Sequence, residues 1–205
     1  MTSGSKLGLT TFAALMALLF VFLPVSAAEE AAPKSAVVAS WKNANKTKIL
    51  LRKGTYSKTS GKGFGWAKIK TRHGIKKYST VKHPTKSPYG EIWKGRPQTK
   101  AEYTAYADKV RKNNGKWIVV EEIPVKTVVE FKHVSSYFKV KLNNAPGVLT
   151  TYCINPNRAL KCPSWVDSAF LPSNNGVVGA MSPRYDGATT YSSSYTPRRI
   201  GQVLN

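Results

Sequence analysis

One histidine lies in a sequence environment that favours acid–base chemistry. His73 is surrounded by five cations, Lys68, Lys70, Arg72, Lys76 and Lys77. Neighbouring positive charge disfavours the charged imidazole, which lowers its pKa and leaves a ring that can accept a proton near neutral pH. The same cations could hold a phosphate and offset the charge that builds up on it in a transition state. This set suits metal-free RNA cleavage, and a solvated histidine on a basic surface fits the same spacing.

A second candidate site is Thr150-Thr151-Tyr152. If residues 148–154 form a strand, Thr150 and Tyr152 point to one face and Thr151 points to the other. A hydroxyl and a phenol side by side can bind a phosphate and orient a ribose. Thr and Tyr are also common in ordinary strands, so in isolation the segment has a purely structural interpretation.

Taken together, the two segments resemble a known family. GFGWAKIKTRHG (63–74) is a basic helix ending in His-Gly, and GVLTTY (147–152) follows at the end of a series of strands. This order is similar to the toxin-type endoribonucleases of the barnase/EndoU/colicin/RelE-like superfamily, with a G-F-G-x-x-H-I-x-x-x-H-type helix and a closing G-x-[IV]-[IL]-T-x-Y strand. His73 matches the second helix histidine, and Thr150 and Tyr152 match the closing strand. The resemblance covers roughly residues 50–153.

This resemblance implies a metal-independent endoribonuclease, in which a 2′-hydroxyl attacks the adjacent phosphate and leaves a cyclic phosphate. It also implies a toxin role, with an immunity protein as a further partner. Lys68 stands where many members have the first histidine, so either the acid–base pair of this catalytic set is altered or the lysine acts electrostatically. Cys153 replaces the usual proline after the tyrosine. Most such toxin domains lie at the end of long delivery proteins, whereas this one follows an export signal.

Two other histidines have weaker interpretations. His133 lies near the end of a predicted strand, and it could supply a second catalytic imidazole if the sheet brings it toward His73. A histidine that merely ends a strand fits equally. His83, between Lys82 and Pro84, is expected in a solvated loop.

The two cysteines, Cys153 and Cys162, are expected to form a disulfide in an oxidising compartment. A metal half-site is the alternative, but the chain has no second cysteine pair and no close histidine pair. We therefore expect no zinc site and no cofactor. If Cys153 were instead a free nucleophile, the chain could be a peptidoglycan-active enzyme.

The elements that would position these residues change type along the chain. The pattern predicts helices over 65–73, ended by Gly74, and over 98–112. Later segments are rich in β-branched and aromatic residues and predict strands, namely 117–123, 125–133, 137–142 and 148–154. The expected fold is α+β, with N-terminal helices packed on an antiparallel β-meander in a single domain. The nuclease domain would span 41–162, and 163–205 would form a Ser/Tyr/Gly-rich extension.

Charge is concentrated in the first half of this domain. The net charge is +22, and residues 42–100 contain seventeen Lys and Arg against one acid, Glu91. Such a segment favours RNA or another polyanion as partner. The alternative function is that of a non-catalytic cationic protein that binds cell-wall polymer, nucleic acid or an anionic membrane surface. In either case we expect a monomer.

The amino end has the composition of a secretory signal. Lys6 precedes an apolar run, and Val25-Ser26-Ala27 matches the small-x-small pattern of a cleavage site. We expect residues 1–28 to be a signal peptide and 29–40 a flexible lead-in. The protein would then be secreted, to the exterior or the cell envelope, with no membrane span after processing. An uncleaved membrane anchor is the alternative.

Overall fold

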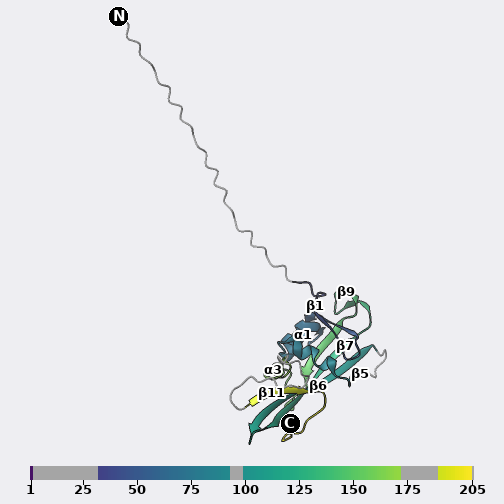
Figure 1. The fold of residues 1–205 in the computed structure, drawn as a ribbon. Helices are drawn as coiled ribbons and strands as arrows, with labels where there is room; N and C mark the ends of the chain where they lie inside the picture. Colours follow the sequence, from purple (N-terminus) through teal and green to yellow (C-terminus); the bar gives the residue numbers. More distant parts are fainter. Residues whose placement is uncertain (2–31, 93–98, 172–188, 205) are drawn as a thin grey trace. The chain divides into compact units, whose positions relative to one another are not determined.

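The structure is a computed structural model, and it describes residues 1, 32–92, 99–171 and 189–204. Two long antiparallel strands, β6 (Lys100–Asn113) and β7 (Lys116–Glu130), form the centre of its main sheet (Figure 1). Asn114 and Gly115 join them, with φ of 47° and 77°. Two-residue turns of this kind match the twist of the strands that they connect.

The remaining strands of this sheet attach to the two sides of the β6–β7 pair. β10 (Gly147–Cys153) pairs with β7, and β11 (Thr189–Ser194) pairs with β6, giving the order β10-β7-β6-β11. Two short strands also join the sheet, with β5 (Glu91–Ile92) pairing with β6 and β12 (Val203–Leu204) pairing with β7. Every pairing is antiparallel.

Smaller elements surround the sheet. Three two-stranded sheets pair β1 with β2, β3 with β4 and β8 with β9. Their bounds are β1 (Val37–Lys42), β2 (Lys48–Arg52), β3 (Thr55–Tyr56), β4 (Gly63–Phe64), β8 (Val134–Tyr137) and β9 (Val140–Asn144). The helices are α1 (Gly65–His73), α2 (Tyr78–Lys82), a 3-10 turn (Pro84–Lys86) and α3 (Val166–Ala169).

The predicted fold class, N-terminal helices packed on a meander, is wrong. The described chain is mostly strand, and its helices are short. The main error is the helix predicted over 98–112, because residues 100–112 of this range belong to β6. Alternate residues of β6 (Ala101, Tyr103, Ala105 and Ala107) are buried, which is the period of a strand. The spacing of Tyr103, Tyr106 and Val110 also fits one face of a helix, and for this reason the sequence pattern predicted a helix here.

Local predictions for α1 were correct. The helix spans Gly65–His73 as expected, and Gly74 ends it in the left-handed conformation with φ of 72°. Its Ile69 is fully buried and shares a hydrophobic core with Ile49, Val125 and Val148. Ile69 therefore anchors the helix, with Trp66 packed against the same core, while Lys70 is exposed.

Other expectations can be compared with the described residues. The predicted disulfide between Cys153 and Cys162 is present. The C-terminal region, which sequence patterns did not place, contributes α3, β11 and β12. The signal peptide predicted over 1–28 falls on residues that, apart from Met1, lie outside the described range. Within the described part of the chain, no helix is long and apolar enough to cross a membrane.

The sheet has two unlike faces. On the buried face, Val125, Thr127 and Val129 of β7 lie within the core, and Thr127 Oγ1 is 3.0 Å from Thr151 Oγ1 of β10. The intervening residues Glu102 and Lys126 are only partly buried. We call the side of the sheet that carries these intervening residues the open face.

We predict that Gly147 tolerates no side chain. Its φ is +75°, and an added Cβ would lie 2.1 Å from the Leu50 carbonyl oxygen. Gly115 is a matched control, because its φ is +77° and nothing lies within 4 Å of an added Cβ. Both Ala substitutions incur the left-handed penalty of about 1–2 kcal/mol. Gly147→Ala should lose a further ~1–3 kcal/mol through the backbone clash. Urea unfolding measures both, and equal losses would contradict the prediction.

Candidate functional site

His73 is the last residue of α1, and the disulfide loop holds it in place. Its Nδ1 lies 3.1 Å from the Leu160 carbonyl oxygen, and its own carbonyl accepts a hydrogen bond from the Cys162 N–H. A carbonyl only accepts, so in the neutral ring the proton sits on Nδ1. The lone pair of Nε2 is then left as the group that can accept a proton.

The environment of His73 lowers its pKa to about 4. Burial is the largest cause, since the residue is only 7% exposed, and the cations Lys68 and Arg72 add to it. The hydrogen bond to Leu160 acts in the opposite direction. Sequence reasoning predicted the direction correctly but assigned it to the cations, whereas the main cause is that the helix end is covered.

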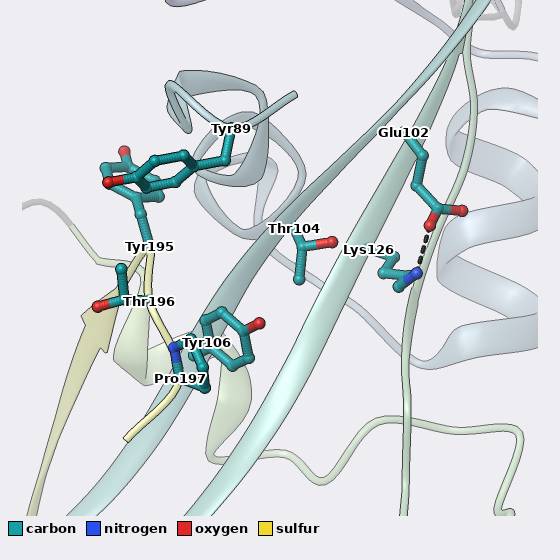
Figure 2. Close-up of a pocket in the computed structure, with 8 residues that line it drawn as sticks. All are labelled: Tyr89, Glu102, Thr104, Tyr106, Lys126, Tyr195, Thr196 and Pro197. Atoms are coloured by element: carbon teal, nitrogen blue, oxygen red, sulfur yellow. Dashed lines mark hydrogen bonds and ion pairs between the residues drawn. The ribbon is translucent and has the colours of Figure 1, made fainter. Parts of the chain in front are cut away.

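Tyr152 lies beside His73, with 5.9 Å between the ring centroids. It is half-buried on β10, directly opposite Lys126 of β7. Its hydroxyl donates to Glu102 Oε2 at 3.5 Å, and Lys126 forms an ion pair with Glu102 Oε1 (Figure 2). Burial, and then Glu102, raises the pKa of the phenol, which keeps its proton at neutral pH. We call Glu102, Lys126, Tyr152 and His73 the Glu102 cluster.

Thr150 belongs to the same face, because it pairs with Val128 two positions along β7 from Lys126. Its Oγ1 is buried and has no hydrogen-bond partner among the described residues. Thr151 points to the other face, as predicted for alternate positions of a strand. The hydroxyl of Thr150 is therefore unpaired but enclosed, because its oxygen has almost no exposed surface and its partner Val128 is also buried.

The predicted phosphate-binding cations are divided by the structure. Lys68 is half-buried, and burial together with Arg72 lowers its pKa. Arg72 donates to the Gly61 carbonyl oxygen at 2.9 Å, which ties it to the loop before α1. Three others are exposed to solvent, Lys70, Lys76 and Lys77. Only Lys68 and Arg72 thus act on His73 directly.

The two remaining histidines lie away from the Glu102 cluster. His133 is exposed and follows β7 at the end where Glu130 pairs with Gly147, whereas His73 lies beside Tyr152 near the other end of β10. The structure therefore does not bring His133 toward His73. His83 was expected to be solvated, and that is wrong. Its ring stacks on Tyr195, with centroids 4.8 Å apart, and burial lowers its pKa to about 4.

Sequence reasoning missed Glu102 and Lys126. Glu102 fell inside the segment predicted as a helix, and on a helix it has no fixed relation to residues of β7 or β10. Lys126 has no local feature that distinguishes it from other lysines. An alternating pattern in 100–107 was the available signal, because it places Glu102 and Thr104 on the face opposite the core.

The open face is also hollowed beside the cluster. A pocket of about 290 Å³ is lined by Glu102 and Lys126, by Thr104 and Tyr106 of β6, and by Tyr89 and residues 195–197 (Figure 2). Among the described residues, no group of three His, Cys, Asp or Glu side chains could hold a metal ion.

We predict that His73 stays neutral down to about pH 5. The unfolded ring, with a pKa near 6.5, takes up a proton before the folded ring does. Protonation then favours the unfolded state, and the free energy of unfolding falls as the pH drops from 6.5 toward 4. NMR titration of the ring signals, assigned with His73→Gln, checks the pKa. Urea unfolding of the same variant should lose part of this pH dependence, and a His73 pKa near 6.5 would contradict the prediction.

Comparison with known proteins gives no relative to guide the assignment. No protein-family model, no curated protein sequence and no solved structure matches the chain. The functional argument therefore rests on this chain's own sequence and on the geometry of the Glu102 cluster.

Proposed function

We propose that this protein is a secreted, metal-independent endoribonuclease that acts on the open face of its sheet. The observation that carries the proposal is the contact between His73 and Tyr152, which joins a neutral imidazole to the Glu102–Lys126 ion pair. An acceptor of protons, a phenolic donor and a cation are then adjacent. Those are the groups that RNA cleavage without a metal requires.

The reaction assigns a role to each group. Nε2 of His73 takes the proton of the 2′-hydroxyl, whose oxygen attacks the adjacent phosphorus. The bond from phosphorus to the 5′-oxygen breaks, giving a 2′,3′-cyclic phosphate, and the leaving 5′-oxygen takes a proton from water to become a hydroxyl, while protonated His73 returns its proton to water. Tyr152 donates its hydrogen bond to the phosphate in place of Glu102, and Lys126 and Lys68 offset the growing negative charge of the phosphate. Because His73 is 7% exposed, we place the 2′-hydroxyl beside the Tyr152 ring, at the edge of the cluster.

Charge supports a polyanionic substrate. The chain carries a net charge of +22, and Lys68 and Arg72 lie close enough to His73 to lower its pKa. Lys126 neutralises Glu102, which reduces the repulsion that this carboxylate would exert on an approaching phosphate. The cluster itself is then neutral, and the positive charge that nucleic acid would meet beside it comes from Lys68 and Arg72.

The resemblance to toxin-type endoribonucleases supports the same proposal. Its two motif segments, the helix ending in His73-Gly74 and the strand containing Thr150 and Tyr152, meet at the cluster. We retain a toxin role, and an immunity protein that covers the open face, as parts of the proposal. The described residues are mostly strand with short helices, and this departs from the layer of N-terminal helices that the resemblance implied.

One observation favours a non-catalytic alternative. The low exposure of His73 and the ion pair that occupies Glu102 suit a surface that binds an anionic polymer without cleaving it. Such a protein would bind RNA with steep dependence on salt, and no single histidine would matter. Cleavage assays separate the two functions directly.

We predict that the protein cleaves single-stranded RNA in EDTA and that His73→Gln lowers the rate about 100-fold or more. Glutamine retains a donor for the Leu160 carbonyl but cannot act as a base. Tyr152→Phe should cause a smaller loss, because it removes one hydrogen bond to the phosphate. End-group analysis of the products should show cyclic phosphate.

The matched control is His133→Gln, at an exposed histidine away from the cluster. It should cleave RNA like the unaltered protein. Circular dichroism checks that each variant is folded. Equal cleavage by folded His73→Gln and the unaltered protein, or no cleavage by either, would overturn the proposed mechanism.

A further inference from the structure

The pocket on the open face has a distinct chemical lining. Figure 2 shows Tyr89 and Tyr195 on one side and the Glu102–Lys126 ion pair on the other, with Thr104 and Tyr106 between them. Tyr89 is 64% exposed, so the edges and faces of its ring are available for contact. Flat apolar rings therefore lie at one end of the pocket, and charged and hydroxyl groups lie at the other.

Pocket size restricts the ligand. At about 290 Å³ the pocket lies at the lower limit of small-molecule sites, roughly 300–1,000 Å³. That volume suits a single planar heterocycle rather than a long peptide side chain together with its backbone. Its hydroxyl groups and carboxylate can accept and donate hydrogen bonds at the edge of such a ring.

We propose that this pocket binds one unpaired base of single-stranded RNA, next to the phosphate that the Glu102 cluster attacks. This inference rests on the proposed function. It adds that the substrate is single-stranded and that the pocket orients the RNA. Stacking on tyrosine requires a base whose face is free, so a base within a duplex cannot enter. Glu102 and Lys126 belong to both the pocket and the cluster, which places the bound base beside the reacting phosphate.

The wall formed by residues 195–197 is held in position before any ligand binds. Tyr195 stacks on His83 with an interplanar angle of 18°. Arg198, the residue after this wall, donates to the fully buried Asp108 of β6 at 2.6 Å. A preformed wall lowers the entropic cost of binding, since the tyrosine does not have to be ordered by the base. This gives the C-terminal segment (189–204) a function in substrate binding.

The test uses a fluorescein-labelled 2′-O-methyl RNA oligonucleotide, which cannot be cleaved because its 2′-oxygen carries no proton. Fluorescence anisotropy should show binding to the full protein that Tyr89→Ala weakens about fivefold or more. Tyr89→Phe, which keeps the ring, should bind almost as well as the unaltered protein. Phe138→Ala is the matched control, because Phe138 is an exposed aromatic residue at the turn between β8 and β9 and does not line the pocket.

A second measurement does not depend on variants. The same oligonucleotide with 5-iodouridine should crosslink under ultraviolet light to Tyr89, Tyr106 or Tyr195, as located by mass spectrometry. Unchanged binding of Tyr89→Ala, together with crosslinks only outside the pocket, would overturn the inference whether or not the protein cleaves RNA. Binding that depends on Tyr89 in a protein that cleaves no RNA would sustain the pocket and overturn the proposed catalysis. The experiments can therefore refute either proposal without refuting the other.

Discussion

The register of the β6–β7 ladder is the constraint on which the rest of the structure depends. Lys126 lies opposite Thr104 on one side and Tyr152 on the other, so the pairing itself places the Glu102 cluster on one face. A slip of one residue would turn Lys126 into the core and expose Val125. Burial of Val125 and Ala105 on the opposite face opposes that slip, and apolar packing therefore determines where the charged cluster lies.

β6 also contains the charged residue that positions the C-terminal segment. Asp108 is fully buried in β6, and burial raises its pKa to about 6 while Arg198 acts in the opposite direction. A buried ion pair adds little net stability, but loss of one partner leaves an uncompensated charge in the interior. Arg198 therefore specifies where residues 195–197 lie more than it stabilises the fold. The neighbouring Glu122 accepts a hydrogen bond from the backbone N–H of Arg198 and further fixes the position of this segment.

Features that depend on neighbours in the sequence could be predicted, and features that depend on distant pairing could not. α1 follows from its apolar spacing and from Gly74, and β10 from its β-branched and aromatic residues. His73 and Tyr152 were found because each lies in such a local motif. Glu102 and Lys126 were missed because their relation exists only in the register of β6 and β7, which a helix predicted over 98–112 conceals. The C-terminal wall of the pocket has the same origin, since it depends on pairing between β11 and β6.

Two histidines with similarly lowered pKa show why titration alone does not identify a catalytic group. His83 lies against Phe170 and Tyr195, and its Nε2 is 3.3 Å from Ser193 Oγ, so its environment is apolar and its ring nitrogen has a protein partner. His73 has its Nδ1 occupied by Leu160, while Lys68 and Arg72 act on it and Tyr152 connects it to Glu102. Burial is the main cause of both shifts, yet only His73 is buried beside groups that can hold a phosphate. What separates the two histidines is therefore the chemistry of their neighbours, because His73 lies beside Lys68 and Arg72 of its own helix, Tyr152 of β10 and Leu160 of the disulfide loop.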